Sequence, residues 1–329
     1  MEILINVILL AFLAMTALSL AFTKDLFASV MLTGIYSLLS AGFFVLMDAV
    51  DVAFTEAAVG AGISTILMLT TLTMTGRFEN RKLHHPKIAL SVVIVTGIML
   101  VMGTVDMPAF GSPSAPAQTH VAPYYIQQSA QDIDIPNIVT SVLASYRGFD
   151  TFGEVVVVFT AVIGVLALLE FARVERADSE KPVPMLQHKI LRIVSKILIP
   201  PIMLFALYVQ FHGEYSPGGG FQAGVIFASS IILYAMLFGI EQTRKAVSVP
   251  VVKVLSALGV LIYGSVGIAS MLNGGTYLNY SVLAENDVTG QHIGIIVIEL
   301  GVGITVATAM ILIFLTFARR IGKTEEETA

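Results

Sequence analysis

Carboxylates inside long apolar runs are the residues of this sequence best placed to do chemistry. Glu56 lies in DVAFTEAAVGAGIST, Glu154 in SYRGFDTFGEVVVV and Glu299 in HIGIIVIELGVGITVA. A charge at the centre of a bilayer costs at least about 2.5–3.5 kcal/mol on insertion scales, and intramembrane carboxylates therefore usually serve ion or proton movement. The three residues are candidates for proton or cation translocation.

Small residues surround Glu56 and permit close helix packing. Gly60 lies one helical turn further on and Gly62 six residues on, so we expect a local distortion of the helix, of which a π-bulge is one form found at functional sites. The alternative is a carboxylate near the outer interface that simply reaches water. Desolvation of the carboxylate by packing would instead let it exchange protons.

Glu154 belongs to a group of three charged residues with helical spacing. Arg147, Asp150 and Glu154 stand at i, i+3 and i+7, close to one face of a helix. A guanidinium can hold part of the charge of two carboxylates in a low dielectric, so the group could store a proton or rest as a salt bridge. Alternatively, Asp150 caps the helix start. For Glu299, which is followed by Gly301 and Gly303, the alternative is a hydrogen bond to a neighbouring helix.

A glycine-rich stretch, SPGGGFQAG from Ser216 to Gly224, lies between two apolar runs. A turn needs one or two glycines, whereas Gly218, Gly219 and Gly220 with Gly224 extend a smooth small-xxx-small surface into the following helix. We interpret the stretch as a docking and shaping element rather than an ion ligand, with a plain turn as the alternative. His212 and His292 lie at nearby membrane edges, where either could relay protons.

The composition predicts an all-α polytopic membrane protein. The chain is 56% hydrophobic and 12% charged, about half the charged fraction of ordinary soluble domains. It contains no Cys, which excludes disulfides and thiolate sites, and no nucleotide-binding loop or hydrolase motif. Apolar runs long enough to span a bilayer occur nine times, at 3–22, 26–47, 52–74, 88–104, 150–172, 192–211, 221–240, 251–272 and 293–318.

The basic residues predict the orientation of these spans. Every Lys and Arg except Arg147 flanks alternate membrane connections. The positive-inside rule makes those connections cytoplasmic, so the N-terminus is expected outside and the C-terminus inside. Arg147, at the outer start of the fifth span, is the exception.

Composition also suggests a division of the chain. The stretch from Asp106 to Pro136 contains GSPSAPAQTHVAP and reads as an irregular outer loop, and RVERADSEKPVPMLQHK reads as a cytoplasmic linker. We expect a four-helix module at 1–104, the outer loop and one helix at 105–172, the linker at 173–189 and a second four-helix module at 190–329.

Two motifs resemble a known family. SPGGGFQAGVIFASS and ELGVGITVAT resemble the B subunit of Mrp (Mnh, Sha) multisubunit cation/proton antiporters over about residues 185–320. DVAFTEAAVGAGIST resembles the MbhD-like module of membrane-bound hydrogenases, and RGFDTFGE the adjoining MbhE-like module. Together these two modules are similar to the J subunit of respiratory complex I. They usually end the large A subunit, whereas here they precede a B subunit.

The resemblance implies a multi-pass subunit of the bacterial cytoplasmic membrane, in a complex that exchanges Na⁺ or another monovalent cation for protons. It implies large antiporter-like A and D subunits and small C, E, F and G subunits as partners, and neither a cofactor, nor nucleic acid, nor enzymatic activity. The family's essential carboxylates map to Glu56 and Glu154, with Asp150 alongside. The family also singles out the Pro and Phe around the glycine run, which map to Pro217 and Phe221. Alternatives are a complex-I-like hydrogenase or bicarbonate-concentrating complex, a passive scaffold, and an independent carrier.

Overall fold

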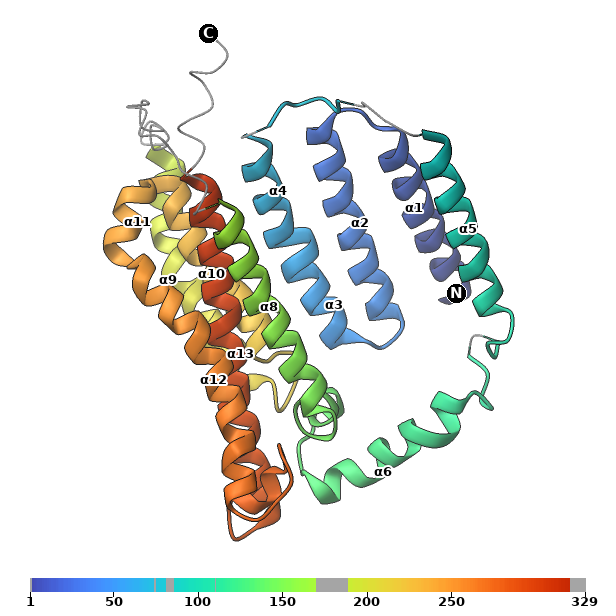
Figure 1. The fold of residues 1–329 in the computed structure, drawn as a ribbon, viewed down its shortest axis with the longest axis vertical. Coiled ribbons are helices and arrows are strands. Elements are labelled where there is room, and N and C mark those ends of the chain that lie inside the picture. Colours follow the sequence, from blue (N-terminus) through green and yellow to red (C-terminus); the bar gives the residue numbers. More distant parts are fainter. Residues whose placement is uncertain (1, 74, 81–85, 110, 170–188, 320–329) are drawn as a thin grey trace.

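The computed structural model describes residues 2–73, 75–80, 86–109, 111–169 and 189–319, and within these ranges the chain is helical without strands. Nine helices in this part are long and apolar enough to cross a membrane, as the apolar runs predict. Consecutive spans run in opposite directions (Figure 1). The basic α11 (Ile240–Ala246), with Arg244 and Lys245, lies at the end of the molecule where the last helix ends. Which end faces the cytoplasm stays a prediction from charge.

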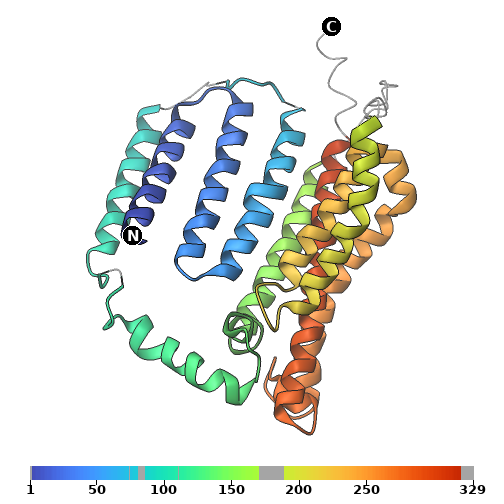
Figure 2. The ribbon, with the colours of Figure 1, turned by 180° about the vertical axis from the view of Figure 1, so that it is seen from behind.

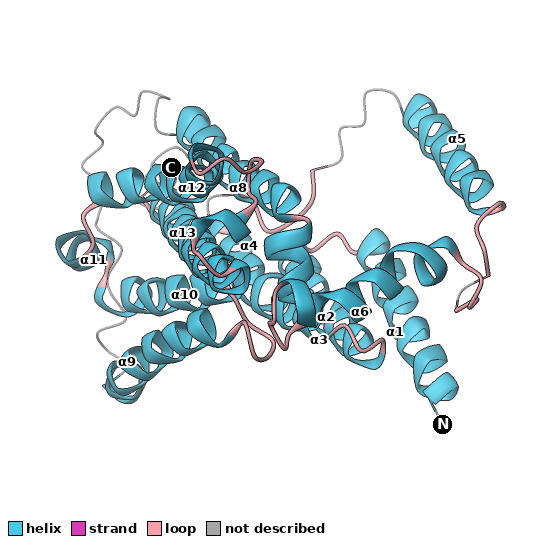
Figure 3. Ribbon diagram, turned by 90° about the horizontal axis from the view of Figure 1, so that it is seen from below, coloured by secondary structure: helices cyan, strands magenta, loops and turns pink. Residues whose placement is uncertain are grey.

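Four spans form the N-terminal part. The third span changes helix type twice but is continuous from Val50 to Leu72. The elements are α1 (Glu2–Phe22), α2 (Leu26–Leu46), α3 (Val50–Glu56), the π-helix η1 (Ala57–Ile63), α4 (Ser64–Leu72) and α5 (Pro86–Thr104). Seen from below, α5 stands apart from the other helices (Figure 3). This part is therefore an open layer of helices and not a closed bundle.

The stretch from Asp106 to Pro136 is only partly irregular, which corrects the expectation of a loop. A π-helix, η2 (Ala117–Val121), leads into α6 (Ala122–Asp132), which crosses beneath the spans between the two halves of the molecule (Figures 1 and 2). Pro123 suggested a loop, but it lies in the first turn of α6, where its missing N–H would have no helical partner anyway. Pro113 and Ser114 do form a turn.

The C-terminal part is a closed bundle around one central helix. Its elements are α7 (Ile138–Thr140), the π-helix η3 (Ser141–Tyr146), α8 (Gly148–Leu169), α9 (Lys189–His212), α10 (Gly220–Phe238), α11, α12 (Val249–Leu272), the 3₁₀-helix η4 (Tyr280–Leu283) and α13 (Asp287–Ala318). Helices α8, α10 and α12 pack around α13, which carries much of the buried core. The predicted linker 173–189 lies outside the described residues except for Lys189.

Candidate functional site

The glycine run makes a turn that only glycine can make. Gly219 has φ +123° and ψ −179°, in a region of backbone space that side chains disfavour. A Cβ on Gly218 would stand 2.8 Å from the carbonyl oxygen of Val209. The turn therefore ends tightly against α9 before α10 begins at Gly220, and the backbone N–H of Gly220 points toward α13.

Glu299 of α13 accepts a hydrogen bond at the start of α10. The amide of Gly220 donates a hydrogen bond to Glu299 Oε2, and the Gly219 backbone lies against the same carboxylate. The first N–H groups of a helix have no helical acceptor and lie at the positive end of its dipole. The alternative considered for Glu299, a hydrogen bond to a neighbouring helix, is thus what the structure contains.

The same run also reaches the N-terminal part of the chain. The amide of Gly218 donates to Asp51 Oδ1 at 3.3 Å, and Asn137 Nδ2 donates to the same oxygen at 3.3 Å. Gln222 is buried and donates from Nε2 to Thr55 Oγ1 at 2.8 Å. We call this meeting point of α3, the Asn137 turn, the glycine run and α13 the glycine junction.

Close packing of α10 on α13 continues beyond the junction. Cβ atoms at Gly220 and Gly224 would collide with α13, the second at 2.8 Å from the carbonyl oxygen of Gly303. Phe221 packs against the hydrophobic core. The small-residue surface of α10 is thus occupied by a helix of the same chain, which explains the glycines at 220 and 224 by close approach.

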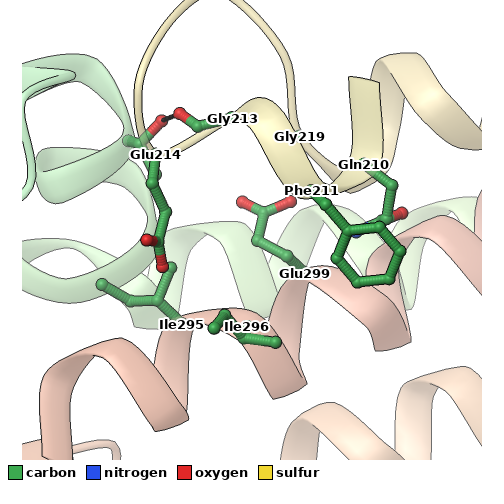
Figure 4. Close-up of a pocket in the computed structure, with 9 residues that line it drawn as sticks. Gln210, Phe211, Gly213, Glu214, Gly219, Ile295, Ile296 and Glu299 are labelled. Atoms are coloured by element: carbon green, nitrogen blue, oxygen red, sulfur yellow. Dashed lines mark hydrogen bonds between the residues drawn. The ribbon is translucent and has the colours of Figure 1, made fainter. Parts of the chain in front are cut away.

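A small cavity of about 70 Å³ opens beside the junction. Glu299 rises toward Gly219, and Glu214 descends from the α9–α10 connection toward Ile295, so both carboxylates flank the same space (Figure 4). Thr140 and Gln210 also line it. At its edge, His292 Nδ1 lies 3.2 Å from Glu214 Oε2. The cavity has room for water, which would contact two carboxylates.

Glu56 lies where the third span changes from α-helix to π-helix. The π-helix Ala57–Ile63 follows it directly, and the expectation of a distorted helix at Gly60 is confirmed. A Cβ on Gly60 would stand 2.5 Å from both Glu56 Oε1 and Ser37 Oγ. Glu56 is half-buried. Its carboxylate fills the space that a side chain at Gly60 would take, next to Ser37 of α2.

Arg147 and Asp150 form an ion pair at 2.5 Å, with 58% and 52% of their side chains exposed. Among the described residues, Glu154 bonds to neither of them, and it is exposed on α8. The spacing thus predicted the pair but not a joined group of three. Asp150 pairs with Arg147 through its side chain, which explains Asp150 without the capping role considered for it.

Two buried tyrosines fix the start of α8 to the bundle. Tyr263 of α12 donates to the carbonyl of Gly148 at 2.7 Å, and Tyr280 of η4 donates to the carbonyl of Ala144 at 3.0 Å. Burial raises the pKa of the Tyr280 hydroxyl, so it stays protonated and remains a donor. The two carbonyl acceptors lie on either side of Arg147, the residue that follows the π-helix η3.

The structure brings some predicted residues together and leaves others apart. Glu299 and the glycine run meet, and Glu56 follows Thr55, the partner of Gln222, whereas the Arg147–Asp150 pair and Glu154 lie on α8 and its N-terminal edge. Asp51, Glu214 and Asn137 were missed. Their signal was position: Asp51 shares a helix start with Glu56, and Glu214 stands two residues before the glycine-rich stretch that begins at Ser216. No group of three His, Asp or Glu in the described part is arranged to hold a metal ion.

Comparison with known families divides the chain into three matched regions. Residues 190–312 match a domain related to the MnhB subunit of a Na⁺/H⁺ antiporter. Residues 11–77 match the MBH component MbhD, and residues 88–185 match the MBH component MbhE.

Curated relatives agree with these matches. The chain is 24% identical over 325 residues to a Rhizobium meliloti protein named as the A/B component of a probable K⁺/H⁺ antiporter, covering 89% of the chain but 32% of that protein. It is 30% identical over 132 residues to the putative antiporter component mnhB2 of Staphylococcus aureus (strain Newman), covering 39% of the chain and 93% of the relative. The chain therefore spans about a third of the longer relative and nearly all of the shorter one.

Two solved structures share the fold. The Mrp complex of Dietzia sp. DQ12-45-1b contains a chain that matches 98% of this one with a TM-score of 0.76 and 23% identity, and 35% of that chain is covered. The membrane-bound sulfane sulfur reductase, an archaeal respiratory membrane complex, contains a chain that matches 70% of this one with a TM-score of 0.52 and 30% identity, and 96% of it is covered.

Proposed function

This chain belongs to the family of MnhB-related antiporter subunits and joins that domain to regions related to MbhD and MbhE, and from this we propose that it is one subunit of a multisubunit monovalent cation/proton antiporter. The complex would lie in the bacterial cytoplasmic membrane, with the N-terminus of this chain outside. It would exchange Na⁺ or K⁺ for protons. Large antiporter-like subunits and several small subunits would be its partners.

The observation that carries this proposal is the position of Glu299. It lies within the longest span, accepts a hydrogen bond from the first turn of α10, and lines a cavity with Glu214. A backbone N–H offsets part of the charge of a carboxylate without neutralising it, so a proton or a cation can still compete for that carboxylate. Such competition is the chemistry of an exchanger.

The exposure of Glu154 supports a partner subunit on α8. Glu154 stands in the second turn of an apolar span and is exposed on the surface of this chain. A carboxylate facing lipid at that depth is costly, whereas a neighbouring subunit could offer it water or a cationic partner. We propose that Glu154 and the Arg147–Asp150 pair face another subunit, and that Glu56 and Glu299 connect this face with the bundle interior.

The test is cation-dependent proton exchange in everted vesicles from cells that express the whole operon. Glu56→Gln, Glu154→Gln and Glu299→Gln keep the size of each side chain and remove its charge. We expect exchange per assembled complex to fall at least tenfold in each, since a positioned proton-transfer group contributes about 10²–10⁴-fold. Glu285→Gln, at an exposed position in a connection, is the matched control and should exchange normally.

Normal exchange by all three assembled variants would contradict the proposal and reduce the chain to a scaffold. Exchange by the purified chain alone, after reconstitution, would instead identify an independent carrier.

A second candidate keeps the fold and changes the complex. The match to a chain of the sulfane sulfur reductase complex favours a respiratory assembly in which related membrane modules move ions. A neighbouring gene for a nickel-iron or other redox catalytic subunit, together with exchange that requires its electron donor, would support this candidate over the antiporter.

A further inference from the structure

We infer that His292 and Glu214 form the port through which protons reach Glu299 from the water at the N-terminal end of α13; this inference rests on the proposed function. The pair stands at the edge of the cavity that Glu299 lines, with 31% of the His292 side chain and 15% of the Glu214 side chain exposed. An ionisable pair thus stands between that cavity and solvent. Neither residue belongs to a motif that carried the family resemblance.

The helix geometry places the pair in line with Glu299. His292 precedes Glu299 by seven residues on α13, so both lie on nearly the same face, about 10 Å apart along the axis at 1.5 Å per residue. That distance is too long for direct proton transfer. Glu214 contacts His292 through one oxygen and lines the same cavity as Glu299, so it links the two residues.

The two oxygens of Glu214 have different surroundings. Oε2 faces His292 Nδ1 at 3.2 Å, whereas Oε1 is buried and has no hydrogen-bond partner among the described residues. A buried oxygen without a partner is costly unless water or a proton reaches it. The cavity beside it has room for water, so Oε1 can pass a proton through water to Glu299.

Each step of the path transfers one proton from a donor to an acceptor. A hydronium ion outside protonates the His292 imidazole, which passes its proton to Glu214, and Glu214 passes one through cavity water to Glu299. Histidine suits the outer step because its ring can accept a proton at one nitrogen and donate one from the other.

The charged groups facing this path come from each element packed around it. They are Glu214 from the α9–α10 connection, His292 and Glu299 from α13, and Asp51 from α3, together with the N–H groups of Gly218 and Gly220. No Lys or Arg is among the described residues that line the cavity. Three carboxylates with one imidazole thus leave an excess of negative charge, which an incoming proton lowers.

The test compares His292→Gln and Glu214→Gln with His212→Gln and Glu285→Gln in everted vesicles of the whole complex, with rates per assembled complex. His212 lies at the same end of the bundle but stacks on Tyr208, with ring centroids 4.7 Å apart. We expect both port variants to slow exchange about tenfold or more near neutral lumenal pH. Acidifying the lumen should restore much of the rate, because protons then reach Glu299 without the port, and both controls should match the wild type.

The outcomes separate the port from the proposed function. Glu299→Gln should not recover at low lumenal pH, because it removes the acceptor and not the supply. Glu214→Asp, which keeps a carboxyl group, should exchange faster than Glu214→Gln. Port variants that match the controls at every lumenal pH, in complexes where Glu299→Gln abolishes exchange, would overturn the port and leave the function standing. A wild-type complex without cation-dependent exchange would overturn the function itself.

Discussion

The central helices of the C-terminal bundle and the outer helices of the N-terminal part differ sharply in how much of each is buried within the chain. Of an 18-residue apolar window in each helix, 67% is buried within the chain in α13 and 50% in α10. In α1 and α5 the buried share is 0%. The C-terminal bundle therefore carries its own core. Helices α1 and α5 expose large apolar side chains along their lengths, a surface that is stable in lipid or against another protein.

The largest expected effect comes from removing core volume on one side of this comparison. Leu312 of α13 is 1% exposed and Leu100 of α5 is 68% exposed. Leu312→Ala should lower the free energy of unfolding of the purified chain in detergent by about 2–5 kcal/mol, because it leaves a cavity. Leu100→Ala should leave it nearly unchanged. Equal losses at both positions would show that α5 is packed within the chain.

Glycine substitutions test the same contrast at the backbone. Gly224→Ala would place a Cβ 2.8 Å from the Gly303 carbonyl oxygen, whereas Gly97 in α5 has nothing within 4 Å. We expect Gly224→Ala to cost about 1–3 kcal/mol through overpacking and Gly97→Ala to gain up to about 1 kcal/mol through helix propensity. Thermal unfolding of the two variants measures both changes. A stable Gly224→Ala protein would mean that α10 and α13 can separate freely.

The tyrosine hydrogen bonds to the start of α8 should contribute less to the free energy of unfolding than the packing of α10 on α13. Tyr280→Phe removes the donor to the Ala144 carbonyl and keeps the ring, so we expect a loss of about 1 kcal/mol, typical of one net hydrogen bond. Tyr208→Phe, on the exposed face of α9, is the matched control and should be neutral. If the bond also positions the Arg147–Asp150 pair, Tyr280→Phe should slow exchange in the assembled complex more than its effect on stability accounts for.

The smallest effect is expected at an exposed ion pair in the N-terminal part. Two hydrogen bonds from Arg77 lower the pKa of Asp25. A lowered folded pKa means that the pair stabilises above the ordinary carboxyl pKa, and that this contribution disappears as the pH falls through the folded value. Arg77→Gln should raise the pKa of Asp25, which a carboxylate NMR titration would detect. The free energy of unfolding should then depend slightly less on pH between about 5 and 3, the range in which carboxyl groups titrate. An unchanged Asp25 titration would contradict this attribution.

The spans and the distortion beside Glu56 could be predicted because their causes are local. An apolar run of sufficient length marks a span, and two glycines after a carboxylate mark a weak point in a helix. The glycine junction could not be predicted in the same way. Asp51 and Gly218 are 167 positions apart, and only the packing of α3 beside α10 brings them together.

Sequence reasoning also ranked carboxylates by depth in apolar runs, which selected Glu299 and passed over Glu214. Glu214 lies in a connection, and it lines the cavity only because that connection packs on α13. The prediction of a loop from 106 to 136 fails for a related reason. Prolines and small residues indicate a loop when taken alone, whereas Pro123 lies in the first turn of α6, a position that tolerates proline.

The length of α13 has a consequence for the surrounding lipid. Its 32 residues extend for about 48 Å at 1.5 Å per residue, whereas the hydrocarbon layer is about 30 Å thick. Arg319 follows the helix directly and anchors that end at the interface, so the excess length emerges at the other end. Glu299, twelve residues from the start of the helix, then lies close to the depth where hydrocarbon gives way to headgroups. Hydrophobic matching thus sets how much of the glycine junction is in water, and acyl-chain length becomes a physical variable of the site.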